Sequence, residues 1–267
     1  MVLVDWLKDM FLGSPASLRF AVFSLSSCGL VRKENQDNLL SLPDAGFFCV
    51  ADGMGGGKGG ALASQWVCEE LSTAVQTGLP HAMDADSRIQ VMDKALQEAN
   101  SRIRAHAREH GFRSMGSTVA LLVFDPQDWL HPTLAHAGDS RIYRLRRGGL
   151  HLLTKDHTVG GELSRKTISR REAEDIGSRS NPLSHILTRA VGTEFKVRPE
   201  WQTIDVKPGD RFLLCTDGVH DMLTDAEIMA ALRGRRSPED IAHRLERGIV
   251  SAGAGDNYSF IYIEVRR

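Results

Sequence analysis

Several features that mark particular functions are missing from this sequence. Its formal net charge is −1 over 267 residues, so no basic field indicates binding to nucleic acid or to an acidic membrane. No apolar run approaches the roughly 20 residues that span a bilayer. Asp5, Lys8 and Asp9 interrupt the N-terminal stretch where a signal peptide would be continuously apolar. We therefore expect a cytoplasmic protein with no nucleic-acid partner and no transmembrane segment.

Cysteine is scarce and dispersed. The sequence holds four cysteines with no CxxC pair: Cys28, Cys49, Cys68 and Cys215. Such spacing argues against a zinc site or a disulfide framework and is typical of reduced thiols in a cytoplasm. There is also no internal repeat, no low-complexity tract and no linker between domains. These absences favour one large globular domain.

Hydrophobic periodicity predicts strands in runs and helices in pairs. The expected strands cover 20–25, 39–42, 47–50, 117–124, 133–137, 141–145, 150–153, 197–206, 211–216 and 258–265. One helix pair is expected between 59 and 111, and a second after the N-caps Thr224 and Ser237. Residues 155–182 are polar and predict at most a short helix at 171–176. This order favours a layered α+β domain over alternating βαβ units.

The first residues form a separate pattern. Leu3, Trp6, Leu7 and Met10 recur at helical spacing, and Gly13-Ser14-Pro15 ends the pattern. Two interpretations are open: a short helix docked on the domain, or an exposed tether for a partner or a membrane surface.

Four acidic turns share one arrangement, in which an aspartate and a small or polar residue lie beside an apolar strand. The aspartates are Asp52, Asp139, Asp217 and Asp256. A lone aspartate at a strand end is usually a turn former. Four carboxylates brought together repel one another, so such a cluster implies a bound cation. No His or Cys accompanies them at metal-ligand spacing, which predicts the hard ions Mg²⁺ or Mn²⁺ rather than Zn²⁺.

Asp52 is followed by a glycine cluster, Gly53-Met54-Gly55-Gly56, which lets the backbone approach a ligand closely. Two adjacent divalent ions can hold a water and clamp a phosphoryl group for in-line attack. Arg32, in a polar loop, is the candidate to hold the phosphate, because its planar fork fits two oxygens at once. By itself, Arg32 would be read as a solvated surface charge.

Seven segments together resemble a known family. They are Arg32-Lys33-Glu34-Asn35-Gln36-Asp37, Ala51-Asp52-Gly53-Met54-Gly55-Gly56, Gly116-Ser117-Thr118, Gly138-Asp139-Ser140-Arg141, Leu187-Thr188-Arg189-Ala190-Val191-Gly192, Thr216-Asp217-Gly218 and Asp256-Asn257. In this order they resemble the metal-dependent serine/threonine protein phosphatases of the 2C type, in particular the compact bacterial members. The resemblance covers about residues 18–265.

The resemblance implies a four-layer α-β-β-α sandwich, in which two antiparallel sheets are flanked by helix pairs. It implies a catalytic domain at 18–267, preceded by an amphipathic extension at 1–17, with a flap at about 156–182. Arg165, Lys166, Arg170 and Arg171 in the flap are either a solvated face or a surface that reads a phosphopeptide or docks a partner.

The resemblance also implies a set of metal ligands. Asp52 would bridge two Mn²⁺ or Mg²⁺ ions, and the Gly53 carbonyl would join the second ion. Asp217 and Asp256 would complete the first, and Asp139 would take part in a third, weaker site.

Among the other positions, Arg32 would bind the substrate phosphate and Asp37 would orient a metal-bound water. Two positions depart from the family pattern. Gln36 replaces a glutamate, which predicts weaker affinity at the second metal. Met54 stands where eukaryotic members have a histidine, so no protein group is assigned as general acid.

The resulting hypothesis is Mn²⁺- or Mg²⁺-dependent hydrolysis of phosphoserine and phosphothreonine in proteins by a metal-activated water, without a covalent intermediate. We expect phosphoprotein substrates, an opposing serine/threonine kinase and a monomer. Two alternatives remain: a phosphoprotein-binding scaffold without turnover, and a hydrolase of small phosphoesters or nucleotides.

Other mechanisms fit the residues poorly. The spacing from Gly53 to Lys58 is too short for a nucleotide-binding P-loop, and Gly59 stands where Ser or Thr is needed. Cys28 and Cys215 lack the correctly spaced arginine of cysteine phosphatases. The remaining candidates are three dispersed histidines, which we expect to be structural or to lie outside the direct ligand shell: His136, His157 and His220.

Overall fold

A computed structural model describes residues 19–56, 58–82, 84–112, 114–125, 127–166, 181–234 and 236–266. The expected extension at 1–17, the short helix at 171–176 and most of the flap lie outside the described residues.

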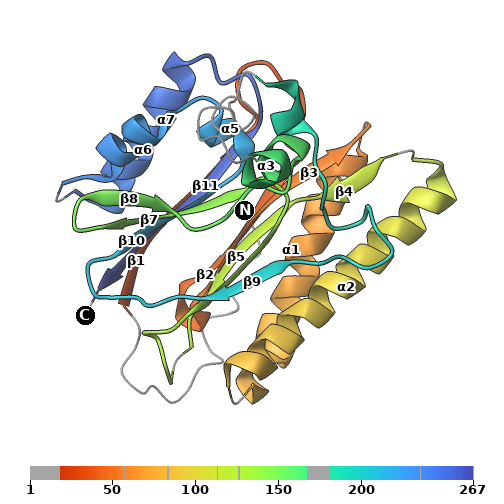
Figure 1. Ribbon diagram of the computed structural model, residues 1–267, viewed down its shortest axis with the longest axis horizontal. Coiled ribbons are helices and arrows are strands. Elements are labelled where there is room, and N and C mark those ends of the chain that lie inside the picture. Colours follow the sequence, from red (N-terminus) through yellow and green to blue (C-terminus); the bar gives the residue numbers. More distant parts are fainter. Residues whose placement is uncertain are drawn as a thin grey trace.

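Two antiparallel β-sheets pack face to face with helices on both outer faces (Figure 1). One sheet has the strand order β1 (Arg19–Ser27), β11 (Tyr258–Arg266), β10 (Arg211–Cys215), β7 (Arg141–Arg146) and β8 (Gly149–Leu152). The other has the order β2 (Asp37–Leu42), β3 (Phe47–Gly55), β5 (Val119–Val123), β6 (Thr133–Ala137) and β9 (Glu200–Thr203), and β4 (Met115–Ser117) pairs with β3. The expected layered sandwich is confirmed.

The helices cover the sheets in pairs. In Figure 1, α1 (Gly59–Thr77) and α2 (Ala85–His110) lie along the sheet that contains β3, and α6 (Asp225–Leu232) and α7 (Pro238–Ser251) lie along the other. The predicted start signals are present: Thr224 forms a capping box with Glu227, and Ser237 accepts a hydrogen bond from the Asp240 amide. No helix among the described residues combines the length and the apolar character needed to cross a bilayer.

The alternation of side chains along β3 divides the core into layers. Phe47, Cys49 and Ala51 pack toward α1 and α2, whereas Phe48 and Val50 point into the layer between the two sheets. All five are fully buried, which explains why the sequence reads as a continuous apolar run. A third cluster packs α6 and α7 against the outer face of the other sheet.

Three local features differ from expectation. β3 does not end at Val50 but continues to Gly55, because it gains a second partner in β4. The polar segment after Lys155 contains α3 (Val159–Lys166), where the sequence indicated no helix. The turn after β10 is a short helix, α5 (Asp217–His220). Single turns at Pro43–Ala45, Leu79–His81 and Pro182–His185 complete the described elements.

Packing between the sheets contributes directly to stability. Ile261 of β11 is fully buried in that layer. Replacing it with alanine leaves a cavity, so we expect Ile261→Ala to lower the free energy of unfolding by about 2–5 kcal/mol and Ile261→Val by about 0.5–1.5 kcal/mol. Urea unfolding measures both changes. Val250→Ala, on an exposed part of α7, is the control, and an Ile261→Ala cost no larger than this control would contradict the proposed layering.

Candidate metal-binding and active site

The aspartates lie at one end of the layer between the sheets. Asp52 follows Phe48 and Val50 at every second position of β3, and Asp37 lies opposite Asp52 in the β2–β3 register. Strand alternation therefore points both carboxylates into the end of the apolar layer. Ala120 and Leu214 also point into this layer, and two positions from them in the sequence stand Thr118 and Thr216. Polar side chains therefore form this end of the core.

The two carboxylate oxygens of Asp37 have different surroundings. The Thr216 hydroxyl donates to Asp37 Oδ2 at 2.8 Å, and the Ser259 amide donates to the Thr216 hydroxyl at 2.9 Å. Asp37 Oδ1 is buried and has no hydrogen-bond partner among the described residues. Burial, with the negative charges of nearby aspartates, raises the pKa of Asp37 to about 7. A buried acceptor without a partner is costly, so this oxygen fits a site that receives a ligand.

Asp52 is the centre of the electrostatic cluster. Its amide donates to the Thr118 hydroxyl at 2.9 Å, and its carbonyl accepts from the Thr118 amide at 2.8 Å. Burial raises the pKa of Asp52 well above its usual range, and four neighbouring carboxylates add to the effect. These neighbours are Asp217, Asp37, Asp139 and Asp256. The structure thus brings all the sequence-predicted aspartates together around one residue.

Three of these aspartates arrive from other elements. Asp217 opens α5, and burial together with the charges of Asp221 and Asp256 raises its pKa to about 7. Asp139 lies in the turn between β6 and β7, and burial and the charge of Asp217 also raise its pKa. Asp256 precedes β11 and forms an ion pair of 2.6 Å with Arg32.

The donor set fits hard divalent cations. Every converging side chain offers carboxylate oxygens, which suit Mg²⁺ and Mn²⁺. The raised pKa values of Asp52, Asp139 and Asp217 show that protons or a cation must compensate the repulsion between these groups. The aspartates of the four acidic turns therefore lie in one cluster in the fold.

Gly53 is required by close packing rather than by an unusual backbone angle. It lies within β3, where a Cβ would overlap the Gly60 carbonyl at the start of α1 and would approach the Gln36 carbonyl to 2.6 Å. A Cβ on Gly60 would in turn come within 2.8 Å of the Gln36 side chain. Glycines at 53 and 60 thus let α1, β3 and the Gln36 loop meet beside Asp52.

The turn that carries Asp139 is fixed by an ion pair that the sequence analysis did not identify. Arg141 donates from Nε to Asp156 Oδ1 at 2.9 Å and from Nη2 to Asp156 Oδ2 at 2.6 Å. Arg141 Nη1 also donates to the Tyr143 hydroxyl at 3.0 Å. This two-point contact connects the start of β7 to the segment before α3. Arg141 is part of the Gly138-Asp139-Ser140-Arg141 segment, but no sequence pattern indicated Asp156 as its partner.

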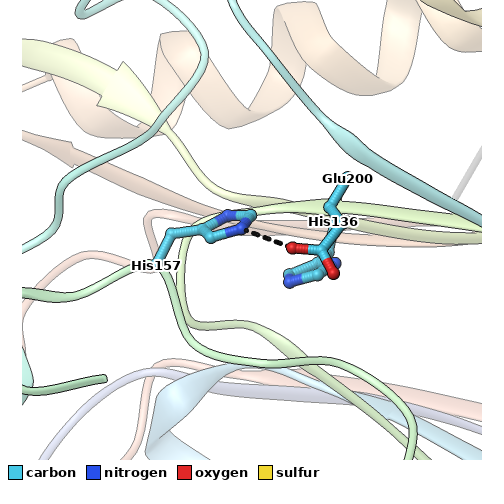
Figure 2. A group of neighbouring side chains, drawn as sticks. All are labelled: His136, His157 and Glu200. Atoms are coloured by element: carbon cyan, nitrogen blue, oxygen red, sulfur yellow. Dashed lines mark hydrogen bonds and ion pairs between the residues drawn. The ribbon is translucent and has the colours of Figure 1, made fainter. Parts of the chain in front are cut away.

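His157 bonds the same turn, and Figure 2 shows it beside His136 and Glu200. The His157 amide donates to the Gly138 carbonyl at 3.0 Å, and the Gly138 amide donates to His157 Nδ1 at 3.4 Å. That contact makes Nδ1 an acceptor, so Nε2 carries the proton and donates to Glu200 at 3.3 Å. His136 stacks on His157 with ring centroids 4.4 Å apart and planes 7° from parallel.

The ligand atoms of His136, His157 and Glu200 lie within 4.8 Å of one another, a spacing compatible with a metal site. However, each imidazole binds a metal along a lone pair in its own plane. Two nearly parallel, stacked rings direct these lone pairs side by side rather than to one point about 2.0–2.1 Å from both. The trio therefore positions the Asp139 turn, which agrees with the expected structural role of these histidines.

Two cavities meet at the aspartate cluster. One of about 540 Å³ is lined by Asp52, Met54, Asp139 and Asp217 on one side and by parts of 185–194 on the other. A second of about 390 Å³ lies under α3 and shares Asp139, His185 and Asp217 with the first. The cluster is therefore open to a ligand from more than one direction.

Comparison with known proteins agrees with this geometry. The family model described as "Protein phosphatase 2C" matches residues 31–247. The chain is 31% identical over 243 residues to the serine/threonine phosphatase stp of Listeria innocua, with 88% of this chain and 92% of the relative covered. The chain belongs to the protein phosphatase 2C family.

Two further similarities concern PstP. The chain is 33% identical over 250 residues to the serine/threonine protein phosphatase PstP of Mycobacterium tuberculosis, covering 93% of this chain. It spans 45% of that relative's length. A solved structure of the catalytic domain of PstP in complex with two manganese ions superposes with a TM-score of 0.77 at 30% identity, covering 93% of this chain and 99% of that one.

Because His157 is buried, we expect the stability of the protein to depend on pH in a specific way. Burial, together with nearby positive charges, lowers the pKa of His157 from 6.5 to about 4. Between these values the unfolded chain binds a proton that the folded chain does not, so the free energy of unfolding should fall as pH drops from 6.5 toward 4. His157→Gln should remove this part of the slope in urea unfolding measured across that range.

The aspartates also titrate in acid, so the difference between variant and wild type is the informative quantity. His81→Gln, at an exposed position, is the matched control and should leave the slope unchanged. An identical slope for His157→Gln and wild type would contradict a neutral, buried His157.

Proposed function

We propose that this chain is a Mn²⁺- or Mg²⁺-dependent phosphatase that hydrolyses phosphoserine and phosphothreonine in proteins. The observation that carries the proposal is the convergence of Asp37, Asp139, Asp217 and Asp256 on Asp52 at the end of the layer between the sheets. Family membership and the named activity of the relatives support it.

The residues proposed to hold the core metal ions are Asp52, which would contact both ions, with the Gly53 carbonyl, Asp217 and Asp256. Asp139 would take part in a third, weaker site. The PstP catalytic domain in complex with two manganese ions supports the number of ions at the core. When bound, such ions lower the pKa of a coordinated water and stabilise negative charge on a phosphoryl group.

Arg32 is proposed to bind the substrate phosphate. Its side chain is more than half exposed, and one nitrogen contacts Asp256. A guanidinium has five N–H donors, so this contact leaves others for phosphate oxygens. Arg32 is thereby fixed beside a proposed metal ligand, where a phosphate could contact both the guanidinium and the ions.

Asp37 is proposed to orient the attacking water through Oδ1, the buried oxygen without a hydrogen-bond partner among the described residues. The Thr216 hydroxyl keeps the other oxygen occupied, which fixes the direction of Oδ1. Met54 lines the larger cavity beside Asp52 and has no proton to donate, so we assign no protein group to protonate the leaving oxygen.

Further parts of the proposal concern the whole molecule. We infer a catalytic domain at 18–267 with a flap at about 156–182, a separate extension at 1–17, and a monomer. Because a phosphatase of this class needs a phosphorylated substrate, its partner reaction is that of a serine/threonine kinase. The four cysteines are free thiols, which supports a location in a reducing cytoplasm.

Two other functions use the same residues. A scaffold would bind phosphoproteins without turnover, and a hydrolase of small phosphoesters would turn over nucleotides as fast as phosphopeptides. Assays of p-nitrophenyl phosphate, nucleotides and a phosphothreonine peptide, each with and without Mn²⁺, separate the three. A folded protein with no metal-dependent turnover of any substrate would refute the enzyme.

Asp52→Asn tests the metal centre. Removing this ligand should lower Mn²⁺ affinity and turnover at least about a hundredfold, since even outer-shell ligand changes cost 10–100-fold. In excess EDTA the variant should be at least as stable to urea as the wild type, because one repelling charge is gone. Calorimetric titration with Mn²⁺ and turnover of p-nitrophenyl phosphate are the measurements. Asp86→Asn, an exposed aspartate on α2, is the control, and unchanged Mn²⁺ affinity in Asp52→Asn would exclude the assignment.

Arg32→Ala tests phosphate binding. Loss of the guanidinium should raise KM for a phosphothreonine peptide by about tenfold or more, since a hydrogen bond to a charged group is worth about 1.5–3 kcal/mol. Arg32→Lys should recover only part of this effect, because lysine is a point charge and not a planar fork. Steady-state kinetics at saturating Mn²⁺ provide the comparison. Equal KM values for wild type and Arg32→Ala would contradict the phosphate role.

A further inference from the structure

Two large apolar side chains lie exposed beside the candidate site. Leu30 is 67% exposed and Val31 is 68% exposed, and they occupy the two positions before Arg32. The other exposed large apolar side chains of the described residues lie on other segments, and two of them adjoin the segment that lines the larger cavity: Ile186 and Phe195. Burying a leucine or valine side chain is worth about 1.5–3 kcal/mol, so an exposed pair next to a reactive centre is a natural contact for a ligand.

The loop that presents this pair is fixed to the body of the protein. Asn257, which is 7% exposed, donates from Nδ2 to the carbonyls of Cys28 at 3.0 Å and Glu34 at 2.9 Å. Its Oδ1 accepts from the Gln36 amide at 2.9 Å. One buried side chain therefore holds both ends of the loop.

The middle of the loop is also fixed. The Leu30 amide donates to the Ala254 carbonyl at 2.9 Å. Gly29 has φ +73°, and a Cβ there would overlap the Asp256 carbonyl, so the loop lies directly against the segment that carries Asp256. The exposed pair is thus presented in a defined place, and its binding requires little ordering of the loop.

We propose that Leu30 and Val31 form an apolar shelf that binds an apolar side chain of the phosphoprotein substrate, one or two residues from the phosphorylated residue. The proposal rests on the proposed function and defines its substrate class. Val31 is the chain neighbour of Arg32, with Cα atoms about 3.8 Å apart, so a segment whose phosphate contacts Arg32 has the exposed Val31 side chain within reach. An extended substrate advances about 3.3 Å per residue, so its neighbouring side chains reach the shelf.

Continuity with the site favours a substrate over other occupants. Arg32 is tied to Asp256 by the 2.6 Å ion pair, and Asn257 directly follows Asp256 and holds the shelf. The group that would bind phosphate and the apolar pair therefore share one rigid support. Leu30 and Val31 adjoin Arg32 in the same fixed loop, and a phosphoprotein is the partner whose phosphate and neighbouring apolar side chain would use both.

The experiment compares phosphothreonine peptides of one sequence that carry leucine or serine at each of the two positions before and after the phosphothreonine. For wild type at saturating Mn²⁺, we expect leucine at one or two of these positions to raise kcat/KM about threefold to tenfold over serine, the range set by partial burial of one side chain. The double variant Leu30→Ser/Val31→Ser should reduce this ratio to about one. Turnover of p-nitrophenyl phosphate, which has no neighbouring residue, normalises the catalytic competence of each protein.

Val250→Ser, an exposed apolar position on α7, is the matched control and should keep the wild-type ratio. Equal kcat/KM for leucine and serine peptides in wild type would overturn the shelf, and so would a preference that survives in the double variant. Either result with normal turnover of p-nitrophenyl phosphate leaves the phosphatase assignment intact. Absence of turnover with every substrate would instead refute the proposed function.

Discussion

The carboxylates of Asp37, Asp52, Asp139, Asp217 and Asp256 meet at the end of an apolar layer, and their repulsion must be compensated there. Two unit charges about 4 Å apart interact by about 4 kcal/mol at an effective dielectric constant near 20, so the uncompensated cluster would oppose folding. Among the described residues, part of the compensation comes from the Thr216 hydroxyl on Asp37 and from Arg32 and the Asn257 amide on Asp256. The remainder, centred on Asp52, is left for protons or cations. A fold that keeps such a destabilising cluster of carboxylates indicates a functional site that binds a ligand.

The sandwich makes this cluster possible, because each aspartate is delivered by a different element to the same end of the core. Phe48 and Val50 from one sheet and Leu214 and Ile261 from the other fill the layer and set the separation of the sheets. The positions of Asp52 and Asp217 therefore depend on how this layer packs. Individual contacts then fix the turn that carries Asp139: Arg141 bonds Asp156, and His157 bonds Gly138.

Much of this arrangement was predictable from the sequence, for identifiable reasons. The capping signals at Thr224 and Ser237 are local, and the layered order of strands and helices followed from periodicity and run lengths. The extension of β3 to Gly55 was not predictable, because it depends on pairing with Met115–Ser117, about sixty residues away. The short helix α3 was also missed, since its polar sequence has no buried stripe. For the site, the sequence identified the aspartates, but the contacts of Asp156, Asn257 and Glu200 depend on long-range geometry that no local pattern encodes.

Buried amide side chains hold the loops on both sides of the cluster. Asn257 bonds the loop that carries Arg32, and Asn100 of α2 accepts from the Gly192 amide at 2.7 Å and donates to the Glu194 carbonyl at 3.1 Å. The second loop lines the larger cavity beside Asp52. An amide both donates and accepts, so one buried asparagine can satisfy several backbone groups without adding charge near the carboxylates. These two loops are thus fixed by neutral side chains, whereas the turn that carries Asp139 is fixed by the ion pair of Arg141 and Asp156.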